Sequence, residues 1–313
     1  MPELPERIEG ALWGLLIGDA LGVPYEFHHA ASIPPPEQIE FEPPAGFPRS
    51  HREVPPGTWS DDGAQALCLL ASLLYRGELD IEDLMRRVTN WYELGYLSAD
   101  GQVFDIGIQT SSALMAYRSG TPAAESGPRT ERDNGNGALM RVLPLALWHT
   151  GSDEELIRDA RRQSVITHGH VRSQLCCALY CLWARRILEQ RDDPWRSAVE
   201  TLDAVLVPGS EEHDELHRVI RPNDDIPFSG SGYVVDSLHS VKAVMNAGSY
   251  EAVVKAAIRL GNDTDTTAAI AGGIAGLRDG AGAIPPRWRE QLRGQELVTP
   301  MLVQLIEHRM QNS

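Results

Sequence analysis

The segment IEGALWGLLIGDALG, residues 8–22, carries large apolar side chains at intervals of three and four positions: Ile8, Leu12, Leu15 and Leu16. Ala66, Leu70, Leu73 and Leu74 repeat this spacing in a helix expected to start near Ala64. Such a period is typical of α-helices that bury one face. Runs of β-branched residues long enough for strands are nearly absent. The sequence therefore predicts an all-α protein, which we expect to be a compact orthogonal multi-helix bundle.

Helical periodicity continues along most of the chain, and two stretches interrupt it. Residues 28–57 contain eight prolines, and residues 119–137 are rich in glycine, proline and charge. Long irregular loops inside a compact domain commonly line a functional site. We interpret both as loops around one site in a single domain, residues 1–313. With ends uncertain by about two to four residues, further helices are expected at 81–94, 107–118, 138–149, 153–165, 171–190, 195–205, 232–247, 250–260, 264–277 and 299–311.

Composition and charge exclude several classes of function. Of the 313 residues, 42% are hydrophobic and 23% charged, as in ordinary globular proteins. The net charge of −16 disfavours nucleic acid or an anionic lipid surface as a general partner. No apolar stretch reaches the roughly 18 residues of a membrane span. The N-terminal segment begins acidic, and Asp19 interrupts its apolar run, which is unlike a signal peptide.

The cysteines indicate a reducing compartment. Cys176, Cys177 and Cys181 fall in one predicted helix, and Cys68 is far away in sequence. Cysteines on one helix make poor disulfide partners, and buried thiols suit a reducing environment. We therefore expect a cytoplasmic protein.

Two acidic segments each precede a predicted helix. GTWSDDG occupies residues 57–63, and GNDTDTT occupies residues 261–267. Ser, Thr and Asp are favoured helix N-caps, so capping alone explains one or two of these side chains. Capping does not explain Asp-Asp-Gly, or Asp-x-Asp-Thr next to a second Thr. The segments therefore also suggest chemistry.

A metal centre would follow if the two segments met in the fold. Four carboxylates about 5 Å apart would repel one another by roughly 3 kcal/mol per pair. Two divalent cations would neutralise them. Hard oxygen ligands suit Mg²⁺, Mn²⁺ or Ca²⁺ better than Zn²⁺, and two such cations can activate water. The spacing alone does not establish that the segments meet.

Several motifs in order resemble one known family. They are G-x-x-x-G-D-A-L-G-x-P-x-E from Gly14 to Glu26, W-S-D-D from Trp59 to Asp62, D-I-G from Asp105 to Gly107, G-N-G-x-L-M-R-x-x-P from Gly135 to Pro144, T-H at Thr167 and His168, and G-N-D-T-D-T-T-A-A-I-A-G from Gly261 to Gly272. The sequence is similar to the ADP-ribosylglycohydrolase family, which includes dinitrogenase reductase-activating glycohydrolase and the ADP-ribosylarginine and ADP-ribosylserine hydrolases.

The resemblance implies an all-α fold with a central cleft that holds two divalent cations, Mg²⁺ or Mn²⁺. Matched position by position, the metal ligands would be Ser60, Asp61, Asp62, Asp263, Asp265 and Thr266. The catalytic residues would be Glu26, Asp105 and Asp62. The ADP-ribose pocket would be formed by Gly135, Asn136, Gly137, His168 and Tyr233. The chain departs from the family at Ser60, usually Thr, at Asn262, usually Gly, and at Ala138, often Ser or Gly.

Plainer structural roles compete with these assignments. Asp19 would be a buried structural carboxylate, and Asn136 would occupy a turn. Asp105 would cap the helix predicted at 107–118, His168 would cap the end of a helix, and Tyr233 would belong to the core. His213 and His217, four apart on a probable helix, lack an evident third ligand, so a solvated helix face is favoured over a zinc site.

The resemblance implies a metal-dependent hydrolase that cleaves the glycosidic bond between ADP-ribose and a modified target. The D-I-G match favours ADP-ribosylarginine on protein. Serine-linked, nucleic-acid-linked or free ADP-ribose derivatives are alternatives, as is a small-molecule ADP-ribose conjugate. A non-catalytic ADP-ribose-binding or structural member of the same fold would lack metal ligands that this chain retains. A metal-dependent phosphohydrolase would add His near the carboxylates. We expect a monomer.

Overall fold

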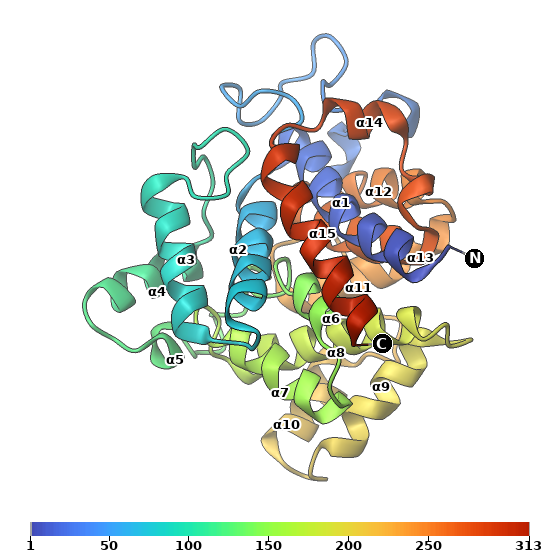
Figure 1. The fold of residues 1–313 in the computed structure, drawn as a ribbon. Helices are drawn as coiled ribbons and strands as arrows, with labels where there is room; N and C mark the ends of the chain where they lie inside the picture. The colour runs from blue at the N-terminus through green and yellow to red at the C-terminus, as the bar shows by residue number, and fades with distance from the viewer. Residues whose placement is uncertain (1, 313) are drawn as a thin grey trace.

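A computed structural model describes residues 2–312, and within this range it contains fifteen α-helices and no strand (Figure 1). The all-α prediction is confirmed. The helices are α1 (Leu4–Gly22), α2 (Asp61–Arg76), α3 (Ile81–Leu94), α4 (Ile108–Arg118), α5 (Ala123–Ser126), α6 (Leu143–Trp148), α7 (Asp153–Ser164), α8 (Val171–Leu188), α9 (Pro194–Val205), α10 (Glu211–Asp214), α11 (Val234–Val244), α12 (Tyr250–Ile258), α13 (Thr264–Asp279), α14 (Pro286–Gln291) and α15 (Gln295–Gln311). A π-helical turn, η4 (Glu215–Ile220), continues α10.

Helices α1 and α13 form an antiparallel pair whose backbones touch. A Cβ added to Gly18 would lie 2.1 Å from the Ala268 carbonyl oxygen, and one on Gly22 would lie 2.3 Å from the Asp265 Cα. Closer to the start of α1, Gly10 faces Gly276 and Gly14 faces Gly272 in the same way. Only glycine permits this approach, although it costs helix stability by about 1 kcal/mol per residue. The pairing places the end of α1 beside the start of α13.

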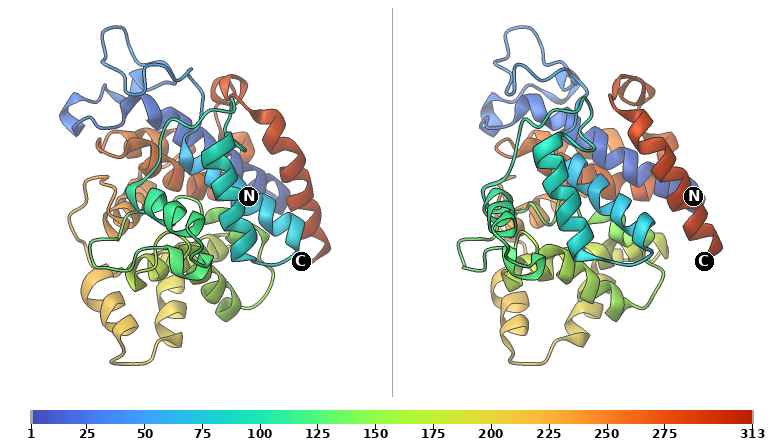
Figure 2. Two further views of the ribbon diagram at one scale, coloured as in Figure 1. Left: turned by 90° about the vertical axis from the view of Figure 1, so that its left-hand side faces the viewer. Right: turned by 60° about the vertical axis from the view of Figure 1, so that its left-hand side comes forward.

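The core is one hydrophobic cluster with members from Ile8 to Leu305, which favours the predicted single domain. Helix α8 contacts α7, α9, α11 and α13, and α15 contacts α1, α2 and α6. The two views of Figure 2 show α1 and α13 side by side, with α9 and α10 at the end of the molecule opposite the loop near residue 50.

Most helix predictions agree with the structure, and the exceptions have local causes. Helix α3 has the predicted bounds, because Asp80 caps its start and Gly95 ends it with left-handed backbone. The helix predicted at 138–149 is wrong in its first part: helix α6 begins only at Leu143, where Pro144 occupies the first turn. Helices α5 and α14 were not predicted, and α15 begins four residues earlier than expected, with Pro300 inside it.

Residues 28–57, the Pro-rich segment, contain only short 3-10 turns among irregular backbone, as predicted. The segment nevertheless packs tightly, because Ile33, Ile39 and Phe41 are buried. The Phe47 ring lies 5.2 Å from that of Tyr25 at the end of α1. The segment is therefore fixed next to the end of α1.

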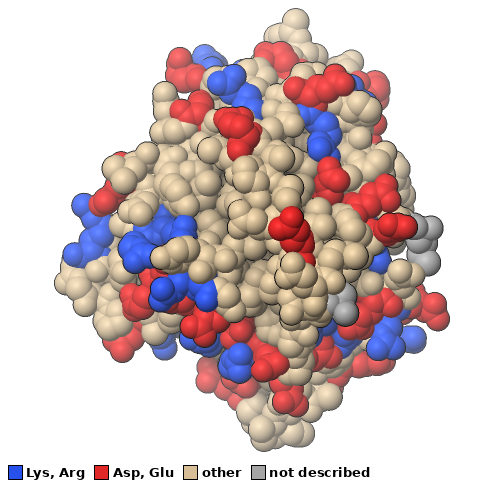
Figure 3. Space-filling model, viewed as in Figure 1, with Lys and Arg blue, Asp and Glu red and all other residues tan. Residues whose placement is uncertain are grey.

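The surface mixes both charge signs. On the face in Figure 3, acidic and basic side chains lie interspersed. Partly exposed ion pairs such as Arg118–Glu93 contribute to this mixture. Among residues 2–312, no helix has the length and hydrophobicity needed to cross a membrane. All four cysteines are buried and free.

Candidate active site

The two acidic segments meet at the α1–α13 pair. Thr266 at the start of α13 donates a hydrogen bond to Asp62 at the start of α2, with 3.3 Å between Thr266 Oγ1 and Asp62 Oδ2. Carboxylate oxygens of Asp62 and Asp265 lie within 4.8 Å of each other and of Asp19. Residues separated by about two hundred positions therefore share one acidic cluster.

A second triad shares Asp265 with the first. Oxygens of Glu26, Asp263 and Asp265 lie within 4.8 Å of one another. Asp61 points into the same cleft, and its Oδ2 accepts a hydrogen bond from Gln65 at 3.3 Å. The structure thus brings all six predicted ligand residues to one place.

Asp19 positions the start of α2, in agreement with the structural role considered above. It is fully buried and accepts hydrogen bonds from the backbone of Ser60, at 2.9 Å and 3.0 Å, and of Gly63, at 2.7 Å. The side chain of Ser60 caps α2 by accepting from the Asp62 amide, and it also donates to Asp62 Oδ2 at 3.1 Å. Helix α2 is therefore anchored to α1 by its first turn.

Burial, together with the neighbouring carboxylates, alters the acidity of this cluster. Burial raises the pKa of Glu26 to about 10, with a further contribution from the charges of Asp105, Asp263 and Asp61. Burial raises the pKa of Asp19 to about 7. The same cause, with neighbouring negative charge, raises the pKa of Asp61, Asp62 and Asp265 well above the usual range. The cluster therefore requires positive charge to ionise fully.

The oxygen atoms present fit divalent cations. Asp62 Oδ1 is buried and has no hydrogen-bond partner among the described residues. An unpaired buried carboxylate oxygen is costly unless a cation or proton satisfies it. The surrounding donors are carboxylate and hydroxyl oxygens, which Mg²⁺ and Mn²⁺ prefer.

A cleft of about 630 Å³ opens onto this cluster, a volume usual for small-molecule sites. Its lining includes Glu26, Asp61, Asp105, Gly135, Asn136, Gly137, His168, Asp263 and Thr266. Ser60, Asp62 and Asp265 lie behind these residues and are nearly inaccessible. The cluster therefore has one group of residues that lines the cleft and a second group behind it.

Glu26 and Asp105 face each other across His51. The distance from His51 Nε2 to Glu26 Oε2 is 2.6 Å, and the three side chains place ligand-type atoms within 4.8 Å of one another. Burial raises the pKa of Asp105 and lowers that of His51. Asp105 does not cap the following helix, because the N-cap of α4 is Gly107. The alternative reading of Asp105 as a helix cap is therefore wrong.

Gly135, Asn136 and Gly137 form a turn in the cleft wall, at the side of His168. A Cβ on Gly137 would lie 2.8 Å from His168 Cε1. His168 is buried, and its Nδ1 lies 2.9 Å from Thr167 Oγ1. Burial lowers the pKa of His168 to about 3. Its ring therefore stays neutral and lines the cleft. Helix α7 ends at Ser164, whose carbonyl accepts a hydrogen bond from the His168 backbone amide at 2.8 Å, so the backbone of His168, and not its side chain, closes the helix.

Asn136 connects the turn to the acidic cluster. Its Nδ2 donates to Asp263 Oδ2 at 2.8 Å and to Ser237 Oγ at 3.0 Å. The turn reading of Asn136 is compatible with this, because the Asn136 carbonyl accepts from Leu139 and Met140. Asn136 thus has both a backbone and a side-chain role.

Tyr233 lies apart from the carboxylates. It is the N-cap residue of α11 and lines a smaller adjoining pocket together with Gln109 and Arg132. The ring is 38% exposed, with the Arg172 guanidinium 5.9 Å from its centroid, so the core reading of Tyr233 is wrong. The backbone bridge to Gly135 links it to the cleft wall.

The structure explains why Asn262 can stand where the family usually has Gly. Its backbone is left-handed, with φ of 60°, a conformation that Gly adopts freely and Asn tolerates. Its side chain donates to the Ser229 carbonyl at 2.9 Å. The substitution therefore preserves the turn.

Sequence reasoning did not identify His51, Gln65 or Arg141 as site residues. His51 comes from the irregular Pro-rich segment, where no periodicity marks it. Arg141 falls within G-N-G-x-L-M-R and is fully buried, donating to Gln65 Oε1 at 3.0 Å and to the Gly137 carbonyl at 3.2 Å. Arg141 thereby connects Gln65, the hydrogen-bond partner of Asp61, to the cleft wall. The motif G-N-G-x-L-M-R was the sequence feature that could have identified Arg141 as a site residue.

Comparison with known proteins agrees with this arrangement. The sequence model of the ADP-ribosylglycohydrolase family matches residues 1–313. The chain is 32% identical over 304 residues to the ADP-ribosylarginine hydrolase Tri1 of Serratia proteamaculans, covering 96% of this chain and 79% of that protein. It is 28% identical to the ADP-ribosyl-[dinitrogen reductase] glycohydrolase of Rhodospirillum rubrum, covering 93% and 92%. A solved structure described as an ADP-ribosylglycohydrolase-related protein complex superposes with a TM-score of 0.78 at 30% identity, covering 98% and 99%. The chain belongs to the ADP-ribosylglycohydrolase family.

Proposed function

We propose that this enzyme hydrolyses the bond between ADP-ribose and arginine on a modified protein, and that it needs two divalent cations, Mg²⁺ or Mn²⁺. The observation that carries the proposal is the convergence of Asp62, Asp265 and Thr266, of which Thr266 lines the cleft and the two carboxylates lie directly behind it. The likeness to an ADP-ribosylarginine hydrolase supports arginine as the acceptor.

The cations would be held by Ser60, Asp61, Asp62, Asp263, Asp265 and Thr266. When bound, such cations supply positive charge that neutralises the carboxylates and lowers the pKa of nearby water. The unpartnered Asp62 Oδ1 supports this assignment. Asn136 would orient Asp263 as a ligand through its 2.8 Å hydrogen bond.

Hydrolysis adds the hydroxyl of water to the anomeric carbon of the ribose and breaks the carbon–nitrogen bond. The departing guanidine nitrogen takes a proton, so the products are ADP-ribose and arginine. Glu26 or Asp105 would move the protons, because both line the cleft and burial raises the pKa of both. We propose Asp62, behind them, as the carboxylate that orients the inner ligands.

The ADP-ribose moiety would lie along Gly135, Asn136 and Gly137. The absence of side chains at the two glycines lets a ligand approach the backbone closely. His168 would bind through a neutral ring nitrogen, since its lowered pKa excludes a charged role at neutral pH. Tyr233 would contact the adenine end from the adjoining pocket.

The four buried free cysteines support a cytoplasmic location, which we also propose. A single domain acting as a monomer completes the proposal.

The test measures free ADP-ribose released by the purified protein from arginine-linked, serine-linked and nucleic-acid-linked conjugates, with and without a chelator. We expect cleavage of the arginine conjugate that stops on chelation and returns with Mg²⁺. Asp61→Asn and Asp265→Asn should lower the rate at least about a hundredfold, because even outer-shell changes cost about 10–100-fold. Asp192→Asn is the matched control, because this exposed carboxylate lies in the connection between α8 and α9, which contributes no residue to the cleft lining.

Two results would contradict separate parts of the proposal. Cleavage of the serine conjugate without cleavage of the arginine conjugate would refute the acceptor. Full activity in chelated protein would refute the metal requirement.

A further inference from the structure

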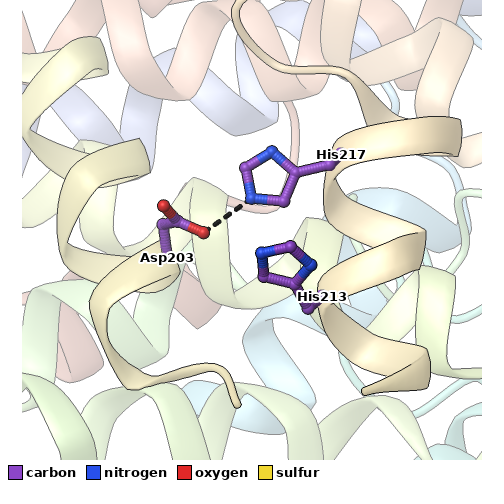
Figure 4. Close-up of side chains that lie close together, drawn as sticks. All are labelled: Asp203, His213 and His217. Atoms are coloured by element: carbon purple, nitrogen blue, oxygen red, sulfur yellow. Dashed lines mark hydrogen bonds and ion pairs between the residues drawn. The ribbon is translucent and has the colours of Figure 1, made fainter. Parts of the chain in front are cut away.

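A second cluster of potential metal ligands lies outside the cleft, between α9 and the helix that follows it. Figure 4 shows Asp203 on α9 facing His213 on α10 and His217 on η4, with one ring nitrogen of each histidine turned toward the carboxylate. Their ligand-type atoms all lie within 4.8 Å of one another. The third group that sequence reasoning did not find for the two histidines is therefore present.

An ion pair accounts for only two of the three residues. His217 Nε2 lies 2.7 Å from Asp203 Oδ1, which alone would tie the two helices together. His213 has no ring hydrogen bond among residues 2–312, and its Nδ1 is buried without a partner. Its ring nevertheless lies close to that of His217, with 4.4 Å between centroids and 47° between the ring planes. The position of His213 needs another explanation.

Three of the neighbouring acidic side chains already have basic partners. Glu212 pairs with Arg161, Asp214 with Arg218, and Glu215 with Arg172. Asp203 is the carboxylate that faces the two imidazoles. The cluster is therefore two nitrogen ligands and one oxygen ligand, not a general acidic patch.

We infer that Asp203, His213 and His217 bind a zinc ion. Two imidazoles and one carboxylate are a frequent zinc ligand set, and they differ from the all-oxygen set of the cleft. The side chains of Asp203 and His217 are 43% and 39% exposed, which leaves room for water as a fourth ligand. The π-helical turn that carries His217 is a feature often found at functional sites.

Zinc at this position would cross-link α9 to the helical segment formed by α10 and η4, which a short loop connects to it. Asp203 lies in the last turn of α9, and the histidines follow the connection at residues 206–210. The η4 turn leads into residues 221–233, whose last members Ser231 and Gly232 line the cleft. Bound zinc would therefore fix the base of a segment that reaches the active site, without entering the site itself.

The test uses the full-length protein with Mg²⁺ at saturating concentration, so that the oxygen-rich cleft is occupied. Zn²⁺ is titrated by calorimetry, and the thermal midpoint is measured with and without Zn²⁺. We expect one zinc per chain that excess Mg²⁺ does not displace, and a higher midpoint when zinc is bound. His213→Gln, His217→Gln and Asp203→Asn should each weaken binding at least about tenfold. Glu200→Gln, on the same helix with its side chain 70% exposed, should bind zinc as the wild type does.

Co²⁺ provides an independent readout, because a four-coordinate nitrogen and oxygen site absorbs visible light far more strongly than a six-coordinate oxygen site. The strong absorption should appear in the wild type and disappear in His213→Gln. Thermal midpoints measured without metal establish that each variant is folded. Unchanged zinc affinity in both histidine variants would overturn the inference. So would a midpoint that depends on His217 and Asp203 without zinc, combined with no zinc binding, since that is the behaviour of an ion pair alone.

Discussion

Removing divalent cations from the protein should leave the cleft carboxylates holding protons that cation binding then releases. A carboxylate oxygen of Asp265 lies within 4.8 Å of oxygens of Asp19 and Asp62, and Asp265 also has an oxygen within 4.8 Å of those of Glu26 and Asp263. Two unit charges at that distance repel by about 3.5 kcal/mol at an effective dielectric near 20. The six pairs within the two triads would together cost about 20 kcal/mol, more than the roughly 5–15 kcal/mol of a domain's stability. Full ionisation without cations is therefore strongly unfavourable.

The direction of the pH effect follows from the raised acidities. The pKa of Asp19 rises from 3.8 to about 7, and that of Glu26 from 4.5 to about 10. Above the ordinary values the unfolded chain has released protons that the folded chain keeps. The free energy of unfolding of the cation-free protein therefore falls as pH rises, by about 1.4 kcal/mol per pH unit for each retained proton. For Asp19 this loss ends near pH 7, and for Glu26 it continues toward pH 10.

The assay has two parts. Mg²⁺ is titrated by calorimetry into chelated protein in buffers of different ionisation enthalpy, which counts the protons released. At about pH 7.5 we expect Mg²⁺ binding to release about two protons per chain, and no fewer than one, because metal ligands bind in their deprotonated form. The thermal midpoint of chelated protein should fall between about pH 5.5 and pH 8, and the rise caused by Mg²⁺ should be larger at the higher pH. Heats that do not depend on the buffer, together with equal rises at both pH values, would refute the reasoning.

Three further predictions concern single residues. Gly18→Ala should lower the free energy of unfolding by at least about 2 kcal/mol in denaturant titration, because its Cβ would lie 2.1 Å from the Ala268 carbonyl and overpacking outweighs the gain in helix propensity; an unchanged midpoint would contradict the close helix contact. His51→Gln should lower kcat about 10–100-fold and shift the pH–rate profile, since the 2.6 Å contact with Glu26 is altered; an identical profile would exclude His51 from controlling that carboxyl. Asn136→Ala should weaken Mg²⁺ binding about 10–100-fold by calorimetry, because Asp263 loses its 2.8 Å hydrogen bond, and unaltered affinity would count against Asp263 as a ligand.

Local signals explain why most of the fold could be predicted. Helix α3 carries an Asp cap, a left-handed glycine at its end and a clear apolar stripe, so its bounds agree with the prediction. Helix α6 was predicted to begin too early, because residues 138–142 are apolar apart from Arg141, yet residues 138–141 form turns. These turns are stabilised by tertiary contacts of Asn136 and Arg141, which a local sequence pattern does not reveal. Periodicity reports which face is buried and does not report what a buried segment packs against.

The sequence identified the candidate site residues better than it predicted how they come together in space. Helix capping and metal binding use the same oxygen side chains, so a single segment cannot distinguish them. Ser60 does cap α2, as the simpler explanation requires. Asp263, however, occupies the N-cap position of α13 without making a capping bond, and its Oδ2 accepts from Asn136 instead. The N-cap position therefore predicts capping for both residues, which is right for Ser60 and wrong for Asp263.

The sequence does contain a signal that the two acidic segments meet: glycines recur at every fourth residue along the first helix. Gly10, Gly14, Gly18 and Gly22 lie on one side of an apolar helix, where glycine would otherwise cost stability. Such spacing indicates a second backbone in contact, and Gly272 and Gly276 supply it in reverse order. An antiparallel contact that pairs Gly14 with Gly272 must place Asp19 near the start of α13, where Asp265 lies. The glycines thus determine which carboxylates become neighbours, and their loss should separate the acidic cluster before any acidic residue is changed.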